Sequence, residues 1–358
     1  MRAPVQKLAD RVASWLIPIV LVFLVGVFVV TGDVSKVVTL LIFTSPAELG
    51  LATPLVMIAA IARAARTGIL IKGGLYLELL ARADAVVFDK TGTLTANKPE
   101  VSQIVAFDAA LPEAELIRLA AAADRRSAHP LAKAVVHEAT RRNLNVPEPQ
   151  DFEQVQARGV RATVEGKVVL VGNPALLREA GVAIDKSVEG TGQTPVHVAI
   201  DGRFAGVIYV ADQLRPGAKQ AIAALKASGV KHIVMLTGDN AATAEAIAEG
   251  LDIDDVKPNL MPEDKVAAIA ELQQQGFKVA MVGDGVNDAP ALARADIGFA
   301  MGGGGTQAAL EAANIALMTD DLSKIVAARN IARRAYRTIQ ENLWVGVGVV
   351  HALGITAA

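Results

Sequence analysis

The sequence predicts an α/β protein: a doubly wound parallel sheet, interrupted by an inserted α+β domain and accompanied by membrane helices. Three short apolar runs have the length of buried parallel strands, and each leads into a loop that bears an aspartate. These runs are Ala85–Phe88, His232–Leu236 and Lys278–Val282. Helical patterns at 217–228 and 241–249 separate the runs. Such alternation of strands and helices indicates a parallel sheet with helices on both faces.

Composition excludes several classes of protein. The 358 residues include no cysteine, so a disulfide framework, a thiolate metal site and a cysteine nucleophile are all ruled out. A formal net charge of -2 gives no support to a nucleic-acid partner. The length suits two or three domains with their own cores.

Two long apolar runs near the N-terminus predict membrane helices at about 12–30 and 37–62, with the intervening residues 31–36 as a tight hairpin. The first run, Trp15–Val30, has no charge, and the second has only Glu48. Basic residues flank the pair: Arg2, Lys7 and Arg11 before it, and Arg63, Arg66 and Lys72 after it. The positive-inside rule therefore places both ends in the cytoplasm. A signal peptide is the alternative for the first run, but a second span follows at once.

The second span contains Ser45, Pro46, Ala47 and Glu48, and a further proline at position 54. Proline removes a backbone donor and frees carbonyls one turn back. A carboxylate at membrane depth is costly unless it lines a cavity or binds an ion. We therefore expect a cation site that includes Glu48 and Ser45. The alternative is a kinked helix in which Glu48 is neutral or paired.

A third apolar run occupies Leu343–Ala358. As a helix rising about 1.5 Å per residue it would not cross the hydrocarbon core, so we expect 331–358 to be a linker and the start of a cut membrane helix.

The loops after the three strands carry the residues with catalytic potential. In such sheets chemistry gathers beyond the carboxyl ends of the strands. Asp89 can act as a nucleophile toward phosphorus, with Mg²⁺ held by Asp89 and Asp284. Thr237 and the amides around Gly238 can hold phosphoryl oxygens, and Lys265 can add a fixed positive charge. The alternative, ordinary helix caps, does not explain the joint order of these residues.

Residues 101–205 interrupt the sheet pattern and predict the inserted α+β domain. A helical stretch at 113–123 precedes alternating strands at 160–171 and 196–210, with turns at Glu165-Gly166 and Asp201-Gly202. Between them, His129 could stack on or hydrogen-bond a nucleotide base. A histidine before a proline at a helix start is, by itself, more often structural.

Four motifs in order resemble the signatures of P-type ATPases, the ion pumps with a haloacid-dehalogenase-like catalytic domain. Asp89–Thr95 reads DKTGTLT, Thr237–Asp239 reads TGD, and Gly283–Asp288 reads GDGVND. Ser127–Ala132, SAHPLA, resembles the His-Pro motif of the heavy-metal-transporting branch. The resemblance runs from about Arg2 to the last residue.

The resemblance implies a role for each matching residue. Asp89 would accept the γ-phosphate of ATP, while Asp284, Asp89 and the Thr91 carbonyl would hold Mg²⁺. The other predicted catalytic residues are Lys90, Thr91, Thr237, Gly238, Asp239, Lys265, Asn287 and Asp288. The predicted ATP pocket comprises Asp124, His129, Pro130, Gly159, Gly172 and Asn173. The expected domains are a phosphorylation domain at 72–100 and 206–330 and a nucleotide-binding domain at 101–205, after the membrane region 1–71.

Related phosphatases carry an aspartate that acts as acid and base at the position of Thr91. A threonine cannot activate water, so the aspartyl-phosphate should persist long enough to drive a conformational change. This residue argues against the alternative of a membrane-anchored phosphatase of the same superfamily. A degenerate, non-catalytic protein is disfavoured because the phosphate-pocket residues are all present.

Several positions depart from the family pattern. Asp124 replaces a glutamate, and Ala157-Arg158-Gly159 replaces Gly-x-Gly. Most of the heavy-metal branch has a cysteine beside the proline that corresponds to Pro46, but here the neighbours are Ser45 and Ala47. Soft monovalent ions such as Cu⁺ and Ag⁺ prefer sulfur ligands. We therefore expect a harder divalent cation such as Zn²⁺, Co²⁺ or Mn²⁺, with Ser45, Glu48 and His351 as ligands. The catalytic subunit of a potassium pump is the alternative within the family.

The actuator motif Thr-Gly-Glu of the family does not occur. We therefore expect a fragment, partnered in the whole polypeptide by an actuator domain and further spans, and no transport by this chain alone. The expected location is a bacterial plasma membrane, as a multi-pass protein with cytoplasmic catalytic domains.

Overall fold

The computed structural model describes residues 4–43, 47–107, 110–184, 193–284, 288–302 and 311–345. The chain forms two compact units. The described residues of 1–89, 217–236 and 251–358 make up the first unit. The second unit consists of the described residues of 90–216 and 237–250.

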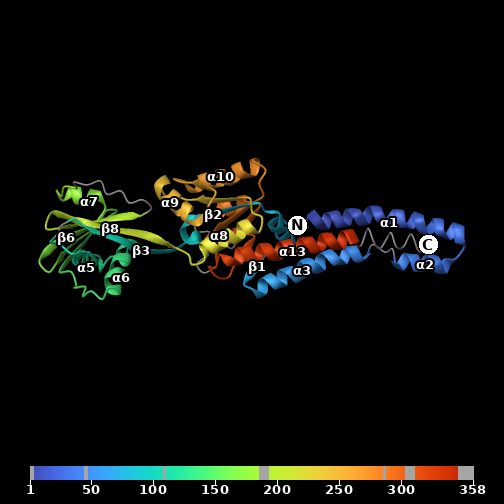
Figure 1. Ribbon diagram of the computed structural model, residues 1–358, viewed down its shortest axis with the longest axis horizontal. Coiled ribbons are helices and arrows are strands. Elements are labelled where there is room, and N and C mark those ends of the chain that lie inside the picture. The colour runs from blue at the N-terminus through green and yellow to red at the C-terminus, as the bar shows by residue number, and fades with distance from the viewer. Residues whose placement is uncertain are drawn as a thin grey trace. The chain divides into compact units, whose positions relative to one another are not determined.

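The first unit is built on a seven-stranded sheet with the order β1-β13-β12-β11-β2-β9-β10 (Figure 1). Every neighbouring pair is parallel except β1 with β13. The strands are β1 (Ile69–Ile71), β2 (Ala85–Asp89), β9 (His232–Leu236), β10 (Asp255–Lys257), β11 (Val279–Gly283), β12 (Ile297–Ala300) and β13 (Ile315–Leu317). The three predicted strands are thus the central neighbours β11, β2 and β9, and the predicted parallel sheet is confirmed.

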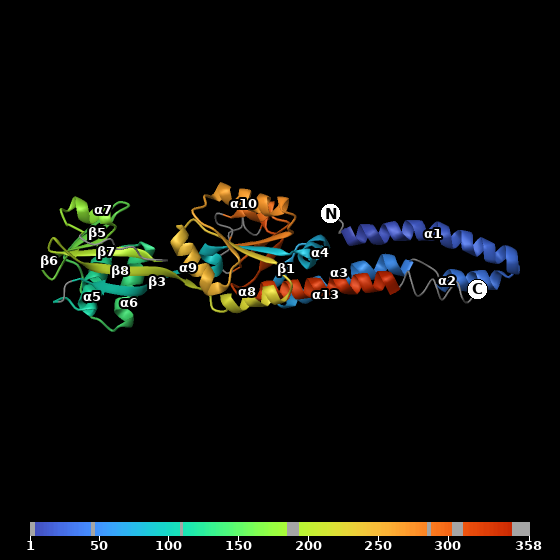
Figure 2. The same cartoon turned by 45° about the horizontal axis from the view of Figure 1, so that its top comes forward.

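Helices on both faces explain why these strands are apolar throughout. β2 and β11 are buried at every position, as expected for parallel strands covered on two sides. Figures 1 and 2 show α10 on one side of the sheet and α8 on the other. The helices of this unit's catalytic part are α4 (Gly74–Arg82), α8 (Ala218–Ala227), α10 (Pro262–Gln274), α11 (Ala289–Arg294) and α13 (Ser323–Val345).

The N-terminal region forms α1 (Pro4–Thr31), α2 (Val34–Phe43) and α3 (Ala47–Arg66). Only Gly32 and Asp33 separate α1 from α2, so the turn is shorter than the expected hairpin. Gly32 has a φ of 62°, and the Asp33 carboxylate accepts the amide of Ser35 at 2.9 Å. These two residues can close the turn because one tolerates a left-handed backbone and the other caps the next helix.

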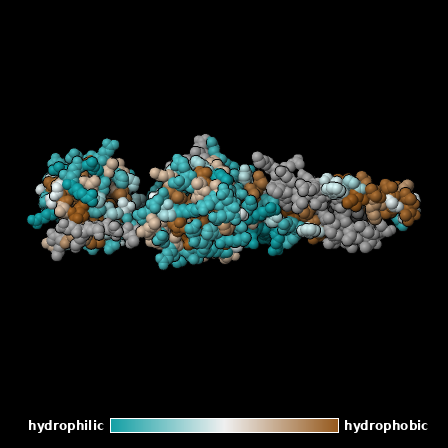
Figure 3. All heavy atoms as spheres, turned by 90° about the horizontal axis from the view of Figure 1, so that it is seen from above, coloured by the Kyte–Doolittle hydropathy of each residue, from teal (hydrophilic) through white to brown (hydrophobic). Residues whose placement is uncertain are grey.

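The predicted spans 12–30 and 37–62 are not confirmed. Within the described ranges, none of the helices combines the length and apolar character that a membrane crossing requires. The predicted second helix corresponds to α2 and α3. Large apolar side chains are nevertheless exposed on α1, including Trp15 (73%), Val22 (74%) and Val30 (86%). Figure 3 shows apolar side chains gathered in this region.

The second unit contains a six-stranded antiparallel sheet with the order β3-β8-β7-β6-β5-β4. The strands are β3 (Thr95–Ala106), β4 (Asp151–Val155), β5 (Gly159–Val164), β6 (Lys167–Gly172), β7 (Thr194–Ile200) and β8 (Arg203–Leu214). The helices are α5 (Glu113–Asp124), α6 (Pro130–Arg141), α7 (Pro174–Glu179) and α9 (Ala241–Leu251). The sheet extends beyond the expected 101–205 at both ends, because β3 and β8 form one long ladder.

Two tight turns in this sheet lie where the sequence predicts them. Glu165 and Gly166 have φ values of 52° and 81°, and Asp201 and Gly202 have 47° and 73°. Positive φ at both central residues is the geometry of the two-residue hairpin that matches strand twist. Leu116, Ile117 and Leu119 of α5 pack into the sheet's main core.

Candidate active site

Asp89 ends strand β2 and is 5% exposed. The Lys265 Nζ lies 2.6 Å from Asp89 Oδ1 and 2.7 Å from Asp288 Oδ1. All three residues belong to the first unit, and the lysine holds two buried carboxylates together. The structure therefore brings the predicted nucleophile, the predicted fixed charge and the predicted loop organiser into one cluster.

The local sequence explains the position of Lys265. Helix α10 begins at Pro262, and the Met261 amide donates to Asp264 Oδ2 at 2.9 Å. Proline at the first helical position and a carboxylate in the first turn both favour a helix start here. Lys265 follows in the first turn and is only 8% exposed. Its side chain reaches Asp89 at the end of strand β2.

Asp288 lies against strand β11 because residue 283 has no side chain. A Cβ added to Gly283 would lie 2.9 Å from Asp288 Oδ2 and 3.1 Å from its Cβ. A side chain at position 283 would therefore force the Asp288 side chain to shift. The glycine before Asp284 thus serves the packing of Asp288.

The electrostatics of the cluster are dominated by burial. The pKa of Asp89 is raised to about 7: burial has the largest effect, the negative charges of Asp288 and Asp284 add to it, and Lys265 acts against them. Burial lowers the pKa of Lys265, but Asp89 and Asp288 raise it more, so the net change is upward. The lysine therefore stays charged, and its charge favours the ionised form of the Asp89 carboxyl group against the effect of burial.

Among the described residues, no group of three or more His, Cys, Asp or Glu side chains is placed to hold a metal ion, so the Mg²⁺ site at Asp89, Asp284 and the Thr91 carbonyl stays a prediction. Asp89, Asp284 and Asp288 supply only oxygen donors, which Mg²⁺ prefers. One lysine does not balance these negative charges, and the Asp288 Oδ2 is buried without a hydrogen-bond partner among the described residues. The register of β11 with β2 pairs Val282 with Phe88, so Asp284 follows at the same edge as Asp89. A divalent cation would relieve this excess of negative charge.

The second unit holds the other predicted phosphoryl-binding residues. The Lys90 Nζ lies 2.6 Å from Asp239 Oδ2. The amide of Asp239 donates to Thr237 Oγ1 at 3.1 Å, a turn that includes Gly238. Thr91 is exposed and has an extended backbone, with φ of -74° and ψ of 130°. Lys90 and Asp239 are thus brought together within this unit.

Arg215, directly after β8, contacts the loop that follows Asp89, and sequence reasoning missed it. Its Nε donates to Thr93 O at 2.9 Å and its Nη2 to Gly92 O at 2.6 Å. Gly92 has a φ of 72°, which only glycine adopts easily. The guanidinium therefore holds the turn after the nucleophile in a conformation that no local pattern predicts. An arginine directly before Pro216, at the end of a predicted strand, is too common to have been a signal.

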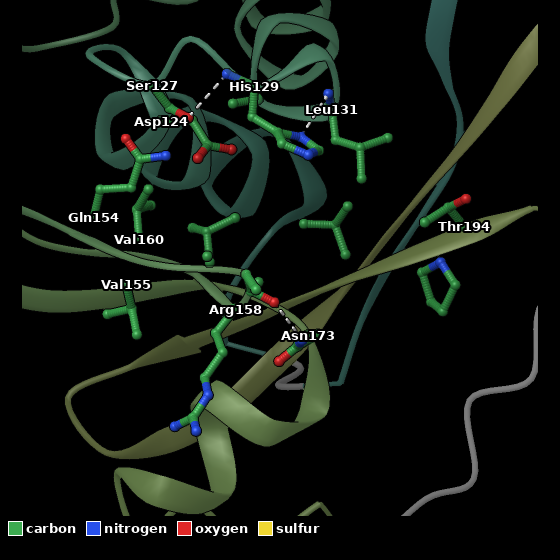
Figure 4. A pocket seen from close by; sticks show the side chains of 17 residues that line it. Asp124, Ser127, His129, Leu131, Gln154, Val155, Arg158, Val160, Asn173 and Thr194 are labelled. Carbon is green, nitrogen blue, oxygen red and sulfur yellow. Dashed lines mark hydrogen bonds between the residues drawn. The ribbon is translucent and has the colours of Figure 1, made fainter.

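A cavity of about 290 Å³ lies in the second unit, against strands β5 and β6 and the segment from α5 to α6. Figure 4 shows Asp124, His129 and Asn173 around it. Of the predicted ATP-pocket residues, Asp124, His129, Gly159, Gly172 and Asn173 line the cavity. Pro130, the first residue of α6, is not among the lining residues.

The polar groups of the cavity have partly structural roles. The His129 Nδ1 accepts the Leu131 amide at 3.2 Å and caps α6. The Asn173 Oδ1 accepts the Leu176 amide at 3.1 Å and caps α7. Asp124 differs from both, since burial raises its pKa to about 7. It is the buried carboxylate of this cavity and the lining group with the strongest need for a polar ligand.

The glycines of the cavity are required by the fold itself. A Cβ at Gly159 would lie 2.2 Å from Val171 O, and one at Gly172 would lie 2.1 Å from Arg158 O. Neighbouring strands approach too closely for any side chain at these positions. Ala157, where the family pattern has glycine, has a φ of 59°. This left-handed conformation is strained for alanine.

A haloacid dehalogenase-like hydrolase family matches residues 83–296. The manganese-exporting P-type ATPase of Mycobacterium tuberculosis strain H37Rv is 40% identical over 97% of this chain and 49% of its own length. A zinc-transporting PIB-type ATPase structure in the E2.Pi state superposes with a TM-score of 0.83, at 37% identity, over 96% of this chain and 57% of that one. The catalytic domain of a CPx-ATPase is 32% identical with a TM-score of 0.61, over 75% of this chain and 98% of its own.

The chain belongs to the haloacid-dehalogenase-like hydrolases and, within them, to the heavy-metal P-type ATPases. The predicted family is therefore confirmed. Relatives from Mycobacterium marinum, Salmonella typhimurium and Bacillus subtilis, at 39–40% identity, are named as exporters of zinc, silver and copper. The chain spans about half the length of the curated relatives it matches.

The remaining predicted site residues of this P-type ATPase chain lie outside the described residues. They are Ser45, Asn287 and His351. Glu48 belongs to the first turns of α3, and its side chain also lies outside the described part. The predicted ion site is thus untested.

Proposed function

We propose that this chain is the catalytic part of an ATP-driven heavy-metal cation pump that works through an aspartyl-phosphate on Asp89. The observation that carries the proposal is the buried cluster of Asp89, Lys265 and Asp288. A carboxylate that is buried, held by a lysine and placed at the tip of a parallel strand suits nucleophilic attack on phosphorus.

In the proposed step an Asp89 carboxylate oxygen attacks the γ-phosphorus of ATP. The new bond joins that oxygen to phosphorus, the bond to the β–γ bridging oxygen breaks, and ADP leaves. Lys265 keeps Asp89 ionised and oriented. Mg²⁺, held by Asp89, Asp284 and the Thr91 carbonyl, would neutralise charge on the phosphoryl oxygens. Lys90 and Thr237, with Gly238, Asp239 and Asn287, would surround those oxygens.

The cavity of the second unit would bind the nucleotide. Its volume of about 290 Å³ is close to the lower end of the range of small-molecule pockets, about 300 Å³. Asp124 supplies a buried acceptor for an amino group, and His129 supplies a ring for the base. Such a cavity, apolar with few convergent polar groups, is typical of a ligand site.

The ion is proposed to be a divalent metal. The relatives differ in the metals they are named for, so similarity alone does not choose among them. The absence of cysteine from the whole chain disfavours soft monovalent ions, and Glu48 favours a harder cation. We also propose that α1–α3 lie in a membrane with the catalytic units in the cytoplasm, which the exposed apolar side chains of α1 support. An actuator domain and further spans would come from the rest of the polypeptide.

Labelled ATP tests the proposal. The chain, incubated with Mg²⁺ and γ-labelled ATP, should acquire alkali-labile label. Asp89→Asn should abolish it, while the exposed control Asp151→Asn should leave it unchanged. Retention of label in Asp89→Asn would exclude this nucleophile.

The ion needs a separate measurement, made on the whole polypeptide in membranes. Phosphorylation should depend on Zn²⁺, Co²⁺ or Mn²⁺, and not on Cu⁺ or K⁺. Glu48→Ala should remove this dependence but leave labelling from inorganic phosphate intact. Dependence on Cu⁺ or K⁺ instead would contradict the choice of a divalent ion.

A further inference from the structure

A second cavity, of about 310 Å³, lies in the first unit between α3 and α13. Figures 1 and 2 both show these helices side by side, and Met57 of α3 and Ile339 of α13 share one buried cluster. The cavity has no place in the phosphorylation chemistry.

One face of α3 supplies one wall of this cavity. Val56, Ala59, Ala60 and Arg63 recur at the spacing of a helix face. The wall is apolar over its first three residues and ends in a guanidinium. The opposite wall, from α13, includes Arg334 and the small residue Ala335. Two arginines thus face a mostly apolar cavity.

Arg63 of α3 and Arg334 of α13 differ in their contacts from the other arginines of α13. Arg329 donates to the carbonyls of Leu80 and Ala83, Arg333 to that of Ser228, and Arg337 pairs with Glu341 at 2.9 Å. Neither Arg63 nor Arg334 has a hydrogen bond or ion pair to any residue within the described ranges. Both arginines are exposed and line the same cavity, so an anion bound there can accept hydrogen bonds from both guanidinium groups.

The apolar end of the cavity continues onto an apolar surface. Leu55 and Ile58, next to the Val56 end on the same helix, are 64% and 63% exposed. The charged end and the apolar end are therefore ordered along α3. A ligand that fits both ends carries a phosphate at one end and a hydrocarbon chain at the other.

We propose that this cavity binds an anionic glycerophospholipid, with its phosphate at Arg63 and Arg334 and an acyl chain along Val56, Ala59 and Ala60. The chemistry is that of basic pockets between helices at a membrane surface. The inference rests on the proposed membrane location of α1–α3, but not on the pumped ion or on Asp89, so its test is separate from that of the proposed phosphorylation.

Native mass spectrometry of the detergent-solubilised chain tests the proposal. Phosphatidylglycerol should be retained about 30-fold more strongly than phosphatidylcholine, as two basic contacts imply. The double variant Arg63→Gln with Arg334→Gln should lose this preference. The control pair Arg66→Gln with Arg337→Gln removes the same charge from the same two helices outside the cavity and should keep it. Ala59→Trp, which narrows the cavity without changing charge, should reduce retention of phosphatidylglycerol even where the double variant does not fold.

Each opposite result would overturn the assignment. Equal retention of the two lipids would exclude recognition of the anionic headgroup. An equal loss of the phosphatidylglycerol preference in the control pair would show that the preference depends on the overall positive charge of the helices and not on Arg63 and Arg334. Equal retention of glycerophosphoglycerol, which lacks acyl chains, would make this a free-phosphate site. Loss of lipid when the rest of the polypeptide is present would show that another segment covers the cavity.

Discussion

Replacing Lys265 by methionine removes the buried cation from the active-site cluster while keeping most of the side chain's volume. The lysine contacts Asp89 and Asp288 at 2.6 and 2.7 Å, and the two carboxylate side chains are only 6% and 1% exposed. Even with Lys265 present, the pKa of Asp89 is about 7. Without it, burial and Asp288 act unopposed and raise this pKa further.

Two quantities should then change in opposite directions as pH rises: the extent of phosphorylation should increase, and the free energy of unfolding should decrease. A protonated carboxyl is a poor nucleophile, so phosphorylation near neutral pH should fall by about 100-fold or more and recover in part as pH rises. Leaving buried carboxylates without a cation costs about 3–5 kcal/mol when they are charged. The folded variant binds more protons than the unfolded chain below its raised pKa, so its free energy of unfolding falls as pH rises through that window.

The assays are single-turnover labelling with γ-labelled ATP at fixed Mg²⁺, and thermal unfolding followed by circular dichroism, each between about pH 5.5 and pH 8.5. The matched control is Lys278→Met, because Lys278 is exposed and its Nζ is 3.9 Å from Asp296 Oδ1. The reasoning is refuted if Lys265→Met and Lys278→Met show the same label and the same pH dependence of stability.

Three further predictions concern the second unit and are read by hydrogen exchange of its α5 and β5 peptides in the intact chain. Asp124→Asn should increase protection from exchange above pH 7, because the pKa of buried Asp124 is raised to about 7. Below about pH 4, the ordinary pKa of an aspartate, the variant and the parent chain should be equally protected. The same difference in protection at every pH would contradict the burial of a charge at Asp124. Ala157→Gly should stabilise by about 1 kcal/mol, because φ of 59° is strained for alanine; a loss of protection would show that the strain is absent. Gly172→Ala should destabilise by about 1–3 kcal/mol, since its Cβ would lie 2.1 Å from a backbone oxygen; a neutral result would mean that the strands can separate freely.

The sequence by itself determined the central architecture and the strand ends that carry the predicted site residues. Apolar runs of strand length that end at Asp89, Thr237 and Asp284 imply a parallel sheet, and the order of strands in such a sheet places loop residues at its carboxyl edge. The turns at Gly166 and Gly202 followed from local chemistry as well. These features depend on short-range patterns, which the sequence displays directly.

The tertiary structure alone decided which groups touch. Lys265 and Asp89 are 176 residues apart in the chain, and Arg215 reaches the Thr93 carbonyl across 122 residues. The strained backbone of Ala157 and the unpaired arginines between α3 and α13 also have no local signature. The physical reason is that such contacts form only when elements distant in the sequence pack together. The spacing of residues within one segment does not determine the distances between such elements.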